Sequence, residues 1–183
     1  MWIRAAAIVT ATLLAAGCGG KKPAKKASSD CGSFGGSTAV QTGGKPSDTM
    51  LLTDVQPKVK RCADTVTFRF RPDRAEEPGY KAEYQPATQA KVQDGSGAII
   101  PVAGTAFLVI RLEPSATADL TGEVLEITYR GPRRFKPAGM RHVQEIVKTS
   151  DFEGVVAWVI GLDEQRPFKV SPSTSPSLAV EIG

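Results

Sequence analysis

Few side chains in this sequence have the types and spacing that catalysis needs. His142 is the only histidine, so any His-assisted serine or cysteine nucleophile would have to use it. The serine in Gly95-Ser96-Gly97 lacks the spacing of a nucleophile elbow, and the tripeptide is typical of a turn. We therefore expect His142 to lie on the surface or at a strand edge rather than in an active site.

Paired carboxylates are the other possible source of chemistry. Asp151 and Glu153 are two residues apart, so on a strand they would share one face. A glycosidase needs two carboxyl groups about 5–9.5 Å apart. The stretch 151–154 nevertheless has the composition of a loop that enters a strand, and Asp163 and Glu164 are simply adjacent. We expect structural roles for these acids.

No cofactor or metal motif is present either. One histidine and the two cysteines Cys31 and Cys62, which are expected to pair with each other, do not supply the three or four ligands of a zinc site. The sequence has neither a calcium-binding loop nor a phosphate-binding glycine loop. We predict no catalytic residue, no metal, no cofactor and no enzymatic activity.

A basic cluster is the better candidate for binding. It interleaves cations with aromatic rings, and the ligand-binding set that we predict is Arg130, Arg133, Arg134, Phe135 and Lys136. Arginine offers a fixed fork of donors to carboxylates, and a neighbouring ring adds an apolar platform. The alternative is a solvated hairpin whose Phe135 packs into the core. We expect Trp158 in the core and an ion pair between Arg166 and Asp163.

Cys18 has a different setting from the other cysteines. It closes the run Leu13-Leu14-Ala15-Ala16-Gly17-Cys18, which resembles a bacterial lipobox. Arg4 precedes an apolar run, 5–16, that is too short to span a bilayer. We predict that residues 1–17 are a lipoprotein signal peptide and that Cys18 carries the lipid. The protein would then be anchored at the extracytoplasmic face of the cell membrane.

Two cysteines remain after Cys18 is assigned. An even number of cysteines in an exported protein usually forms disulfides, because disulfides persist outside the cytoplasm. We predict a Cys31–Cys62 disulfide. The alternative is two free thiols.

The excess positive charge lies outside the expected folded part. Residues 18–48 are rich in Gly, Lys, Ser and Thr and poor in apolar side chains, so we predict a disordered tether. Residues 49–183 carry equal numbers of basic and acidic side chains. A nucleic-acid partner is therefore not expected, although the sequence pI is about 9.0. The 135 residues of this part suit one domain.

That domain has the pattern of short strands. In Thr65–Arg71, Val66, Phe68 and Phe70 alternate with polar residues, as in a half-buried antiparallel strand. Further strands are expected at 50–55, 79–84, 106–110, 155–160, 168–170 and 178–182. Gly, Pro, Asp and Ser separate these runs, which favours a sandwich or barrel over a helical fold. Residues 142–148 fit either a helical turn or a strand.

The ordered set of motifs resembles a known family. It comprises Leu52-Thr53-Asp54-Val55, Thr65-Val66-Thr67-Phe68-Arg69-Phe70, Pro78-Gly79-Tyr80, Asp94-Gly95-Ser96-Gly97, Tyr129-Arg130-Gly131-Pro132-Arg133-Arg134, Asp151-Phe152-Glu153-Gly154-Val155 and Trp158-Val159-Ile160-Gly161-Leu162-Asp163. In order and spacing the set is similar to the AMIN-like domain of exported actinobacterial proteins and lipoproteins. The resemblance covers about residues 50–183. It departs from the family pattern at 58–63, where a cysteine stands in place of a plain β-turn.

The resemblance implies a fold and a function. AMIN domains accompany peptidoglycan amidases and secretins, are associated with cell-wall binding, and are β-sandwiches of two small sheets. We therefore expect a single antiparallel β-sandwich that binds peptidoglycan or another envelope component without catalysis. The basic cluster would meet peptidoglycan carboxylates. The alternative is an envelope protein bound along an exposed edge strand, and a cell-wall hydrolase is less expected.

Overall fold

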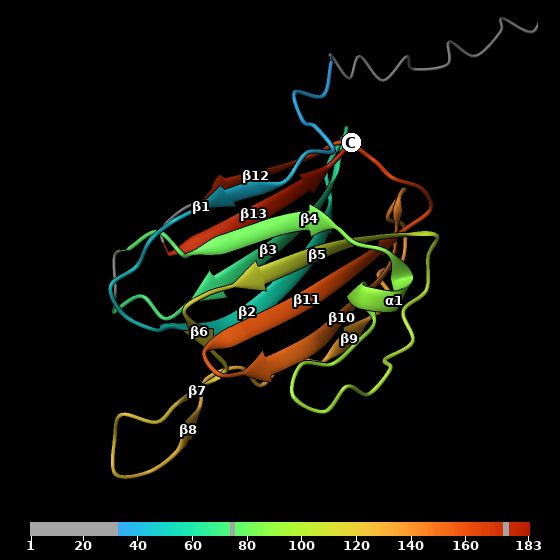
Figure 1. Cartoon of the computed structure of the whole chain (residues 1–183). Coiled ribbons are helices and arrows are strands. Elements are labelled where there is room, and N and C mark those ends of the chain that lie inside the picture. Colours follow the sequence, from blue (N-terminus) through green and yellow to red (C-terminus); the bar gives the residue numbers. More distant parts are fainter. Residues whose placement is uncertain (1–32, 74–75, 174–175) are drawn as a thin grey trace, which may run out of the picture.

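The computed structural model describes residues 33–73, 76–173 and 176–183 (Figure 1). The predicted signal peptide, Cys18 and Cys31 lie outside the described residues. The first described residues and the C-terminus lie at one end of the fold in Figure 1, and a hairpin projects from the opposite end.

Two mainly antiparallel sheets form a sandwich. The first has the order β1 (Gln41–Gly43), β4 (Tyr80–Tyr84), β5 (Ala106–Leu112), β11 (Val155–Leu162), β10 (Val143–Phe152) and β9 (Arg134–Phe135). The second has the order β12 (Phe168–Pro172), β13 (Ser177–Ile182), β3 (Asp64–Phe70), β2 (Met50–Val59) and β6 (Ser115–Ala116). A small third sheet pairs β7 (Ala118–Asp119) with β8 (Glu126–Ile127), and α1 (Ala87–Ala90) is a single turn. The predicted all-β sandwich is confirmed.

The burial of each strand follows its sequence pattern. In β3, Val66, Phe68 and Phe70 are buried and Arg69 is exposed, as the alternation predicts. By contrast, every residue of β11 is buried. This strand is covered on its second face by a smaller apolar cluster that includes Ala90 of α1 and Val102 of the following loop. A continuously apolar run therefore marks a strand that is covered on both sides.

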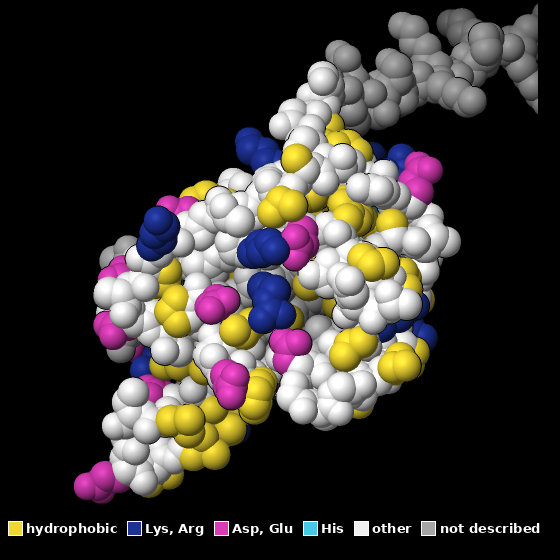
Figure 2. Space-filling model, viewed as in Figure 1, with side chains coloured by type: hydrophobic (Ala, Val, Ile, Leu, Met, Phe, Trp, Pro, Cys, Tyr) yellow, Lys and Arg dark blue, Asp and Glu magenta, His cyan; other side chains and the backbone are white. Residues whose placement is uncertain are grey.

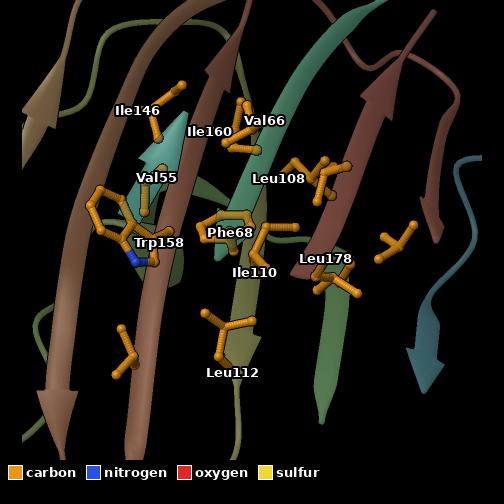
Figure 3. Close-up of a cluster of buried hydrophobic side chains, with 14 of the residues drawn as sticks. Val55, Val66, Phe68, Leu108, Ile110, Leu112, Ile146, Trp158, Ile160 and Leu178 are labelled. Atoms are coloured by element: carbon orange, nitrogen blue, oxygen red, sulfur yellow. The ribbon is translucent and has the colours of Figure 1, made fainter. Parts of the chain in front are cut away.

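The main core lies between the two sheets and centres on Trp158 (Figure 3). The indole is fully buried and contacts three rings at centroid distances of 5.7–6.1 Å, those of Phe68, Tyr129 and Phe135. The prediction that Trp158 is a core residue is confirmed. Three aromatic neighbours from separate strands and loops make it the centre of the packing.

Residues 142–148, whose sequence fits either a helical turn or a strand, lie in or next to a strand. β10 runs for ten residues and pairs with β11 on one side and β9 on the other. Register shifts fall between Val143 and Glu145 and between Lys148 and Ser150. These irregularities break the strict alternation of apolar side chains, and for that reason the sequence pattern was ambiguous.

The start of the folded part corrects the predicted tether boundary. Ser37 bridges to Phe168, and β1 pairs with β4, so residues from 37 onward belong to the sandwich rather than to a disordered segment. The Gln41 side chain donates to the carbonyl of Phe168 (2.8 Å) and accepts from the N–H of Val170 (2.9 Å). An amide side chain thus links the first sheet to the edge of the second. Hydrophobic patterning cannot reveal such a link, because no apolar side chain carries it.

All three tyrosines have phenol pKa values above the usual value. Burial raises the pKa of Tyr80 and Tyr84, and burial followed by the charge of Asp54 raises the pKa of Tyr129 to about 12. Folding therefore favours the protonated phenols, so their contribution to stability is complete below pH 10 and is lost as the pH rises toward 12. Ultraviolet titration should show less than half of the tyrosine ionised at pH 10.

The variant Tyr129→Phe provides the control for that titration. It should remove the ionisation step near pH 12, because burial and the charge of Asp54 raise the pKa of the Tyr129 phenol to about 12. Half-ionisation of all three tyrosines near pH 10 in the folded protein would contradict the burial argument.

Candidate functional site

A groove at one end of the first sheet brings together residues that are far apart in sequence. It has a volume of about 550 Å³ and lies where the end of β1, the start of β4 and the end of β5 meet. Its lining includes Gly43, Gly44, Lys45, Tyr80, Lys81 and Arg111. The lining carries three cations and one acid, Glu113.

Glycines allow the backbones around the groove to approach closely. Gly44 has a φ of 63°, and a Cβ there would lie 2.1 Å from the carbonyl oxygen of Pro78. A Cβ on Gly79 would lie 2.0 Å from the carbonyl oxygen of Glu113, whose N–H donates back to Gly79 (3.0 Å). Larger residues at these two positions would push the walls of the groove apart.

Tyr80 supplies the aromatic surface of the groove. Its ring lies over Gly43, where a Cβ would come within 2.7 Å of the ring carbon. Tyr80 also packs against the main core, so the position of its ring is fixed. Its hydroxyl makes no hydrogen bond to a described residue, and it is available to a ligand.

The cations of the groove differ in their partners. Lys81 pairs with Glu83 (2.8 Å) and Arg111 with Asp94 (3.1 Å), and both cations are partly exposed. The hydrogen bond from Lys81 is the main reason why the pKa of Glu83 is lowered. Lys45 is exposed and forms no ion pair with a described residue. Figure 2 shows cationic and acidic side chains interleaved over this face of the sheet.

The structure divides the ligand-binding set that the sequence predicted. Phe135 is part of the core around Trp158. Arg134 pairs with the buried Glu145 (2.7 Å) and donates to the carbonyl of Pro101 (2.9 Å). These two residues have structural roles, in agreement with the alternative of a hairpin whose ring is buried.

The other three members of that set remain exposed. Lys136 lies 3.9 Å from Glu145. Arg130 and Arg133 form no ion pair with any residue in the described part of the chain. The cluster therefore lacks the aromatic platform that the sequence suggested, because the Phe135 ring packs against the core. Two of its cations, Arg134 and Lys136, lie close to Glu145.

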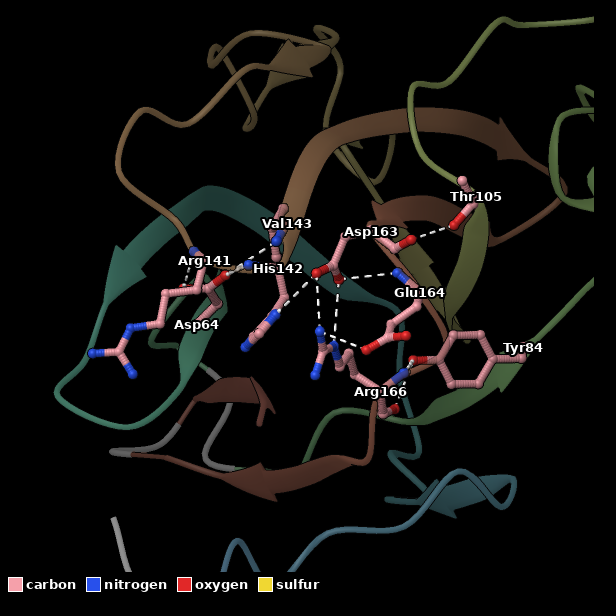
Figure 4. A network of polar contacts seen from close by, with 9 residues as sticks. All are labelled: Asp64, Tyr84, Thr105, Arg141, His142, Val143, Asp163, Glu164 and Arg166. Atoms are coloured by element: carbon pink, nitrogen blue, oxygen red, sulfur yellow. Dashed lines mark hydrogen bonds and ion pairs between the residues drawn. The ribbon is translucent and has the colours of Figure 1, made fainter. Parts of the chain in front are cut away.

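His142 belongs to a polar network at the opposite end of the first sheet (Figure 4). Its Nδ1 lies 3.3 Å from Asp163, which also pairs with Arg166 (3.0 Å). The predicted Arg166–Asp163 pair is therefore present. Tyr84 accepts from the N–H of Arg166 and donates to its carbonyl. The second ring nitrogen of His142 has no hydrogen-bond partner among the described residues.

Burial would raise the pKa of Asp163, but its interactions with Arg166 and His142 outweigh that effect, and the pKa is lowered. The carboxylate is thus an acceptor that holds the network together. This arrangement joins the end of β11 to the loop that precedes β10.

The two acids considered for glycosidase chemistry have separate roles. Asp151 accepts from the ammonium group of Lys148 (2.7 Å) and from the hydroxyl of Thr117. Glu153 is exposed in the β10–β11 turn, with a φ of 50°. Asp151 is therefore a partner of a buried lysine.

Only one of the two cysteines that are predicted to pair lies in the described part of the chain. Cys62 lies in the turn between β2 and β3 and is not a free thiol. Cys31 lies outside the described residues, so the Cys31–Cys62 pairing stays a prediction, as does the lipid on Cys18. Within the described ranges, no group of three or more His, Cys, Asp or Glu side chains could hold a metal ion. No described helix is long and apolar enough to cross a membrane.

The edge strands bear on the alternative of a bound protein partner. The described edge strands are two to five residues long, and the longest, β12, already bonds to Ser37 and Gln41. Binding along an edge strand stays a prediction.

Comparison with known proteins adds one finding. A family model described as the AMIN-like domain matches residues 50–182. No curated protein and no solved structure matches the chain. The match spans the sandwich from β2 to β13 and leaves β1 outside.

Proposed function

The chain belongs to the AMIN-like domain family, and from this premise we propose that it is a non-catalytic module that binds peptidoglycan in the cell envelope. Membership of the family suggests an envelope-related binding module. The finer assignment rests on the groove of β1, β4 and β5.

The combination of groups in that groove supports peptidoglycan as the ligand. Peptidoglycan offers carboxylates on its stem peptides and lactyl groups, and sugar faces that stack on aromatic rings. Lys45, Lys81 and Arg111 can meet the carboxylates, and Tyr80 offers a ring and an unpaired hydroxyl. Arginine retains free donors when a single contact of 3.1 Å ties it to Asp94. This convergence of three cations and one ring is the observation that carries the proposal.

The absence of catalysis is part of the same proposal. The sole histidine is engaged with Asp163, and Asp151 is engaged with Lys148. Incubation with purified cell wall is expected to release neither soluble muropeptides nor free amines across the pH range. Release that disappears in a His142→Ala variant would contradict a purely binding role.

The location is proposed from the N-terminal sequence. Lipidation of Cys18 would anchor the chain at the extracytoplasmic face of the membrane, on the same side as peptidoglycan. A Cys31–Cys62 disulfide would tie the tether to the turn between β2 and β3.

Co-sedimentation with insoluble peptidoglycan tests the proposal. The chain from Gly19 to Gly183 should sediment at physiological salt well above an albumin control, and less at high salt, because exposed charges are screened. Lys81→Ala combined with Arg111→Ala should weaken binding at least about tenfold, as should Tyr80→Ala.

The variant Arg130→Ala combined with Arg133→Ala is the matched control. It removes the same number of cations from the candidate cluster identified in the sequence, and it should bind as the parent does. Loss of binding in this control alone would transfer the site to the cluster. No sedimentation above albumin would rule out peptidoglycan.

A further inference from the structure

The projecting hairpin is the most apolar exposed part of the described molecule. We call residues 118–128 the arm; it contains β7 and β8, with Ala118 opposite Ile127 and Asp119 opposite Glu126. Leu120 and Val124 are 77% and 79% exposed, and Leu125 and Ile127 are also exposed. Figure 2 shows hydrophobic side chains gathered over the arm. A monomeric protein rarely exposes a contiguous set of this kind.

The arm forms one wall of a second groove. This groove has a volume of about 390 Å³ and lies between Leu120, Leu125 and Ile127 on one side and Phe152 of the β10–β11 turn on the other. Phe152 is itself 48% exposed. Next to it, Glu153 holds a positive φ that non-glycine residues rarely adopt. Two neighbouring segments thus expose apolar side chains toward the same space.

Polar contacts hold the base of the arm in place. Arg71 pairs with Asp119 and Glu126, the two residues that face each other across β7 and β8. The Thr128 hydroxyl donates to the carbonyl of Leu52 (2.8 Å). Hydrogen bonds, mainly from Thr121, lower the pKa of Asp119 to about 2, so its charge persists at neutral pH. The apolar face is therefore displayed by a fixed hairpin.

The charges around the arm fall into two adjacent groups. Glu123 on the arm and Glu153 beside the groove are exposed acids without an ion-pair partner in the described part. Arg130 follows the arm by two residues. The backbone carbonyl of Arg133 accepts the N–H of Lys148 (2.8 Å), and the ammonium group of Lys148 donates to Asp151, which lines the groove. The exposed acids on and beside the arm are therefore followed along the chain by two exposed arginines, Arg130 and Arg133, whereas Lys148 is buried and paired with Asp151.

We propose that the arm is the interface of a symmetric dimer of this chain. A two-fold rotation would lay the arm of one copy against the basic residues of the other, and the same contact would occur twice. Glu123 would meet Arg133 of the partner copy, and the apolar side chains of the two arms would cover each other. An anionic lipid surface fits less well, because the groove lining offers Asp151 and Glu153 but no cation. This proposal is independent of peptidoglycan binding.

Sedimentation equilibrium of the chain from Gly19 to Gly183 tests the dimer. The mean mass should rise from monomer to dimer with concentration. Leu120→Ser combined with Val124→Ser should raise the dissociation constant at least about tenfold. Val40→Ser combined with Val59→Ser, which alters exposed valines elsewhere, should leave the mass unchanged.

Charge reversal tests the register of the interface. Glu123→Arg and Arg133→Glu should each weaken the dimer, and the double variant should recover it. A monomer at every concentration would overturn the proposal, as would a dimer that the arm variants do not affect. Flotation of a monomeric chain with anionic phospholipid vesicles, lost in Leu120→Ser/Val124→Ser, would assign the arm to a lipid surface instead.

Discussion

Replacing Asp64 with alanine is expected to lower the free energy of unfolding by about 3 kcal/mol or more. Asp64 is fully buried at the start of β3, and its carboxyl group accepts three consecutive backbone N–H groups. The donors are those of Arg141 (3.1 Å), His142 (2.8 Å) and Val143 (3.0 Å) (Figure 4). Alanine would leave these donors without their acceptor. The hydrogen bond to Val143 is buried and the other two are partly buried, and a buried unsatisfied donor costs about 1–3 kcal/mol.

Asp64→Asn is the matched variant for this prediction. Its side chain has the same shape but only one acceptor oxygen. We therefore expect a free energy of unfolding between that of the parent and that of Asp64→Ala. Urea unfolding followed by circular dichroism measures all three proteins. Equal stability of Asp64→Ala and the parent would contradict the role of this carboxyl group in joining the second sheet to β10.

Replacing Trp158 with alanine is the second change with a large expected effect. The side chain is fully buried and contacts three aromatic rings. Its removal would leave a cavity in the main core, where Figure 3 shows it beside Phe68. Losses for buried tryptophan are about 3–5 kcal/mol. Since domains of this size have total stabilities of about 5–15 kcal/mol, the variant should unfold at a much lower temperature.

Trp158→Phe separates packing from hydrogen bonding. The indole N–H of Trp158 has no hydrogen-bond partner among the described residues, so phenylalanine removes a buried donor without breaking a bond. We expect a loss of only about 1–2 kcal/mol from the smaller ring. Thermal melts by circular dichroism give the comparison. If Trp158→Phe lost as much as Trp158→Ala, an unseen hydrogen bond would have to hold the indole.

The strands of the core could be predicted because the local pattern of apolar and polar side chains indicates which faces are buried. Val66, Phe68 and Phe70 alternate with polar side chains, and β11 is apolar throughout because both of its faces are covered. β1 could not be predicted in this way. It is held by pairing with β4 and by the amide of Gln41, and neither leaves a hydrophobic pattern.

The candidate site shows the same limit. In β9, Phe135 lies opposite Ile146 and Arg134 opposite Val147, so adjacent residues point to opposite faces. The sequence reveals the cluster of cations, whereas the register of β9 decides that the Phe135 ring packs against the core. The groove joins Lys45, Tyr80 and Arg111 across more than sixty positions, and only the pairing of β1, β4 and β5 brings them together.

The most direct test of the account is a nuclear magnetic resonance titration of the chain from Gly19 to Gly183 with a soluble muropeptide. The amide signals that shift should be those of Gly43, Gly44, Lys81 and Arg111, because these residues line the groove. Shifts confined to residues 130–136, or no shifts at ligand concentrations that saturate other wall-binding modules, would contradict the assignment of the groove as the peptidoglycan site.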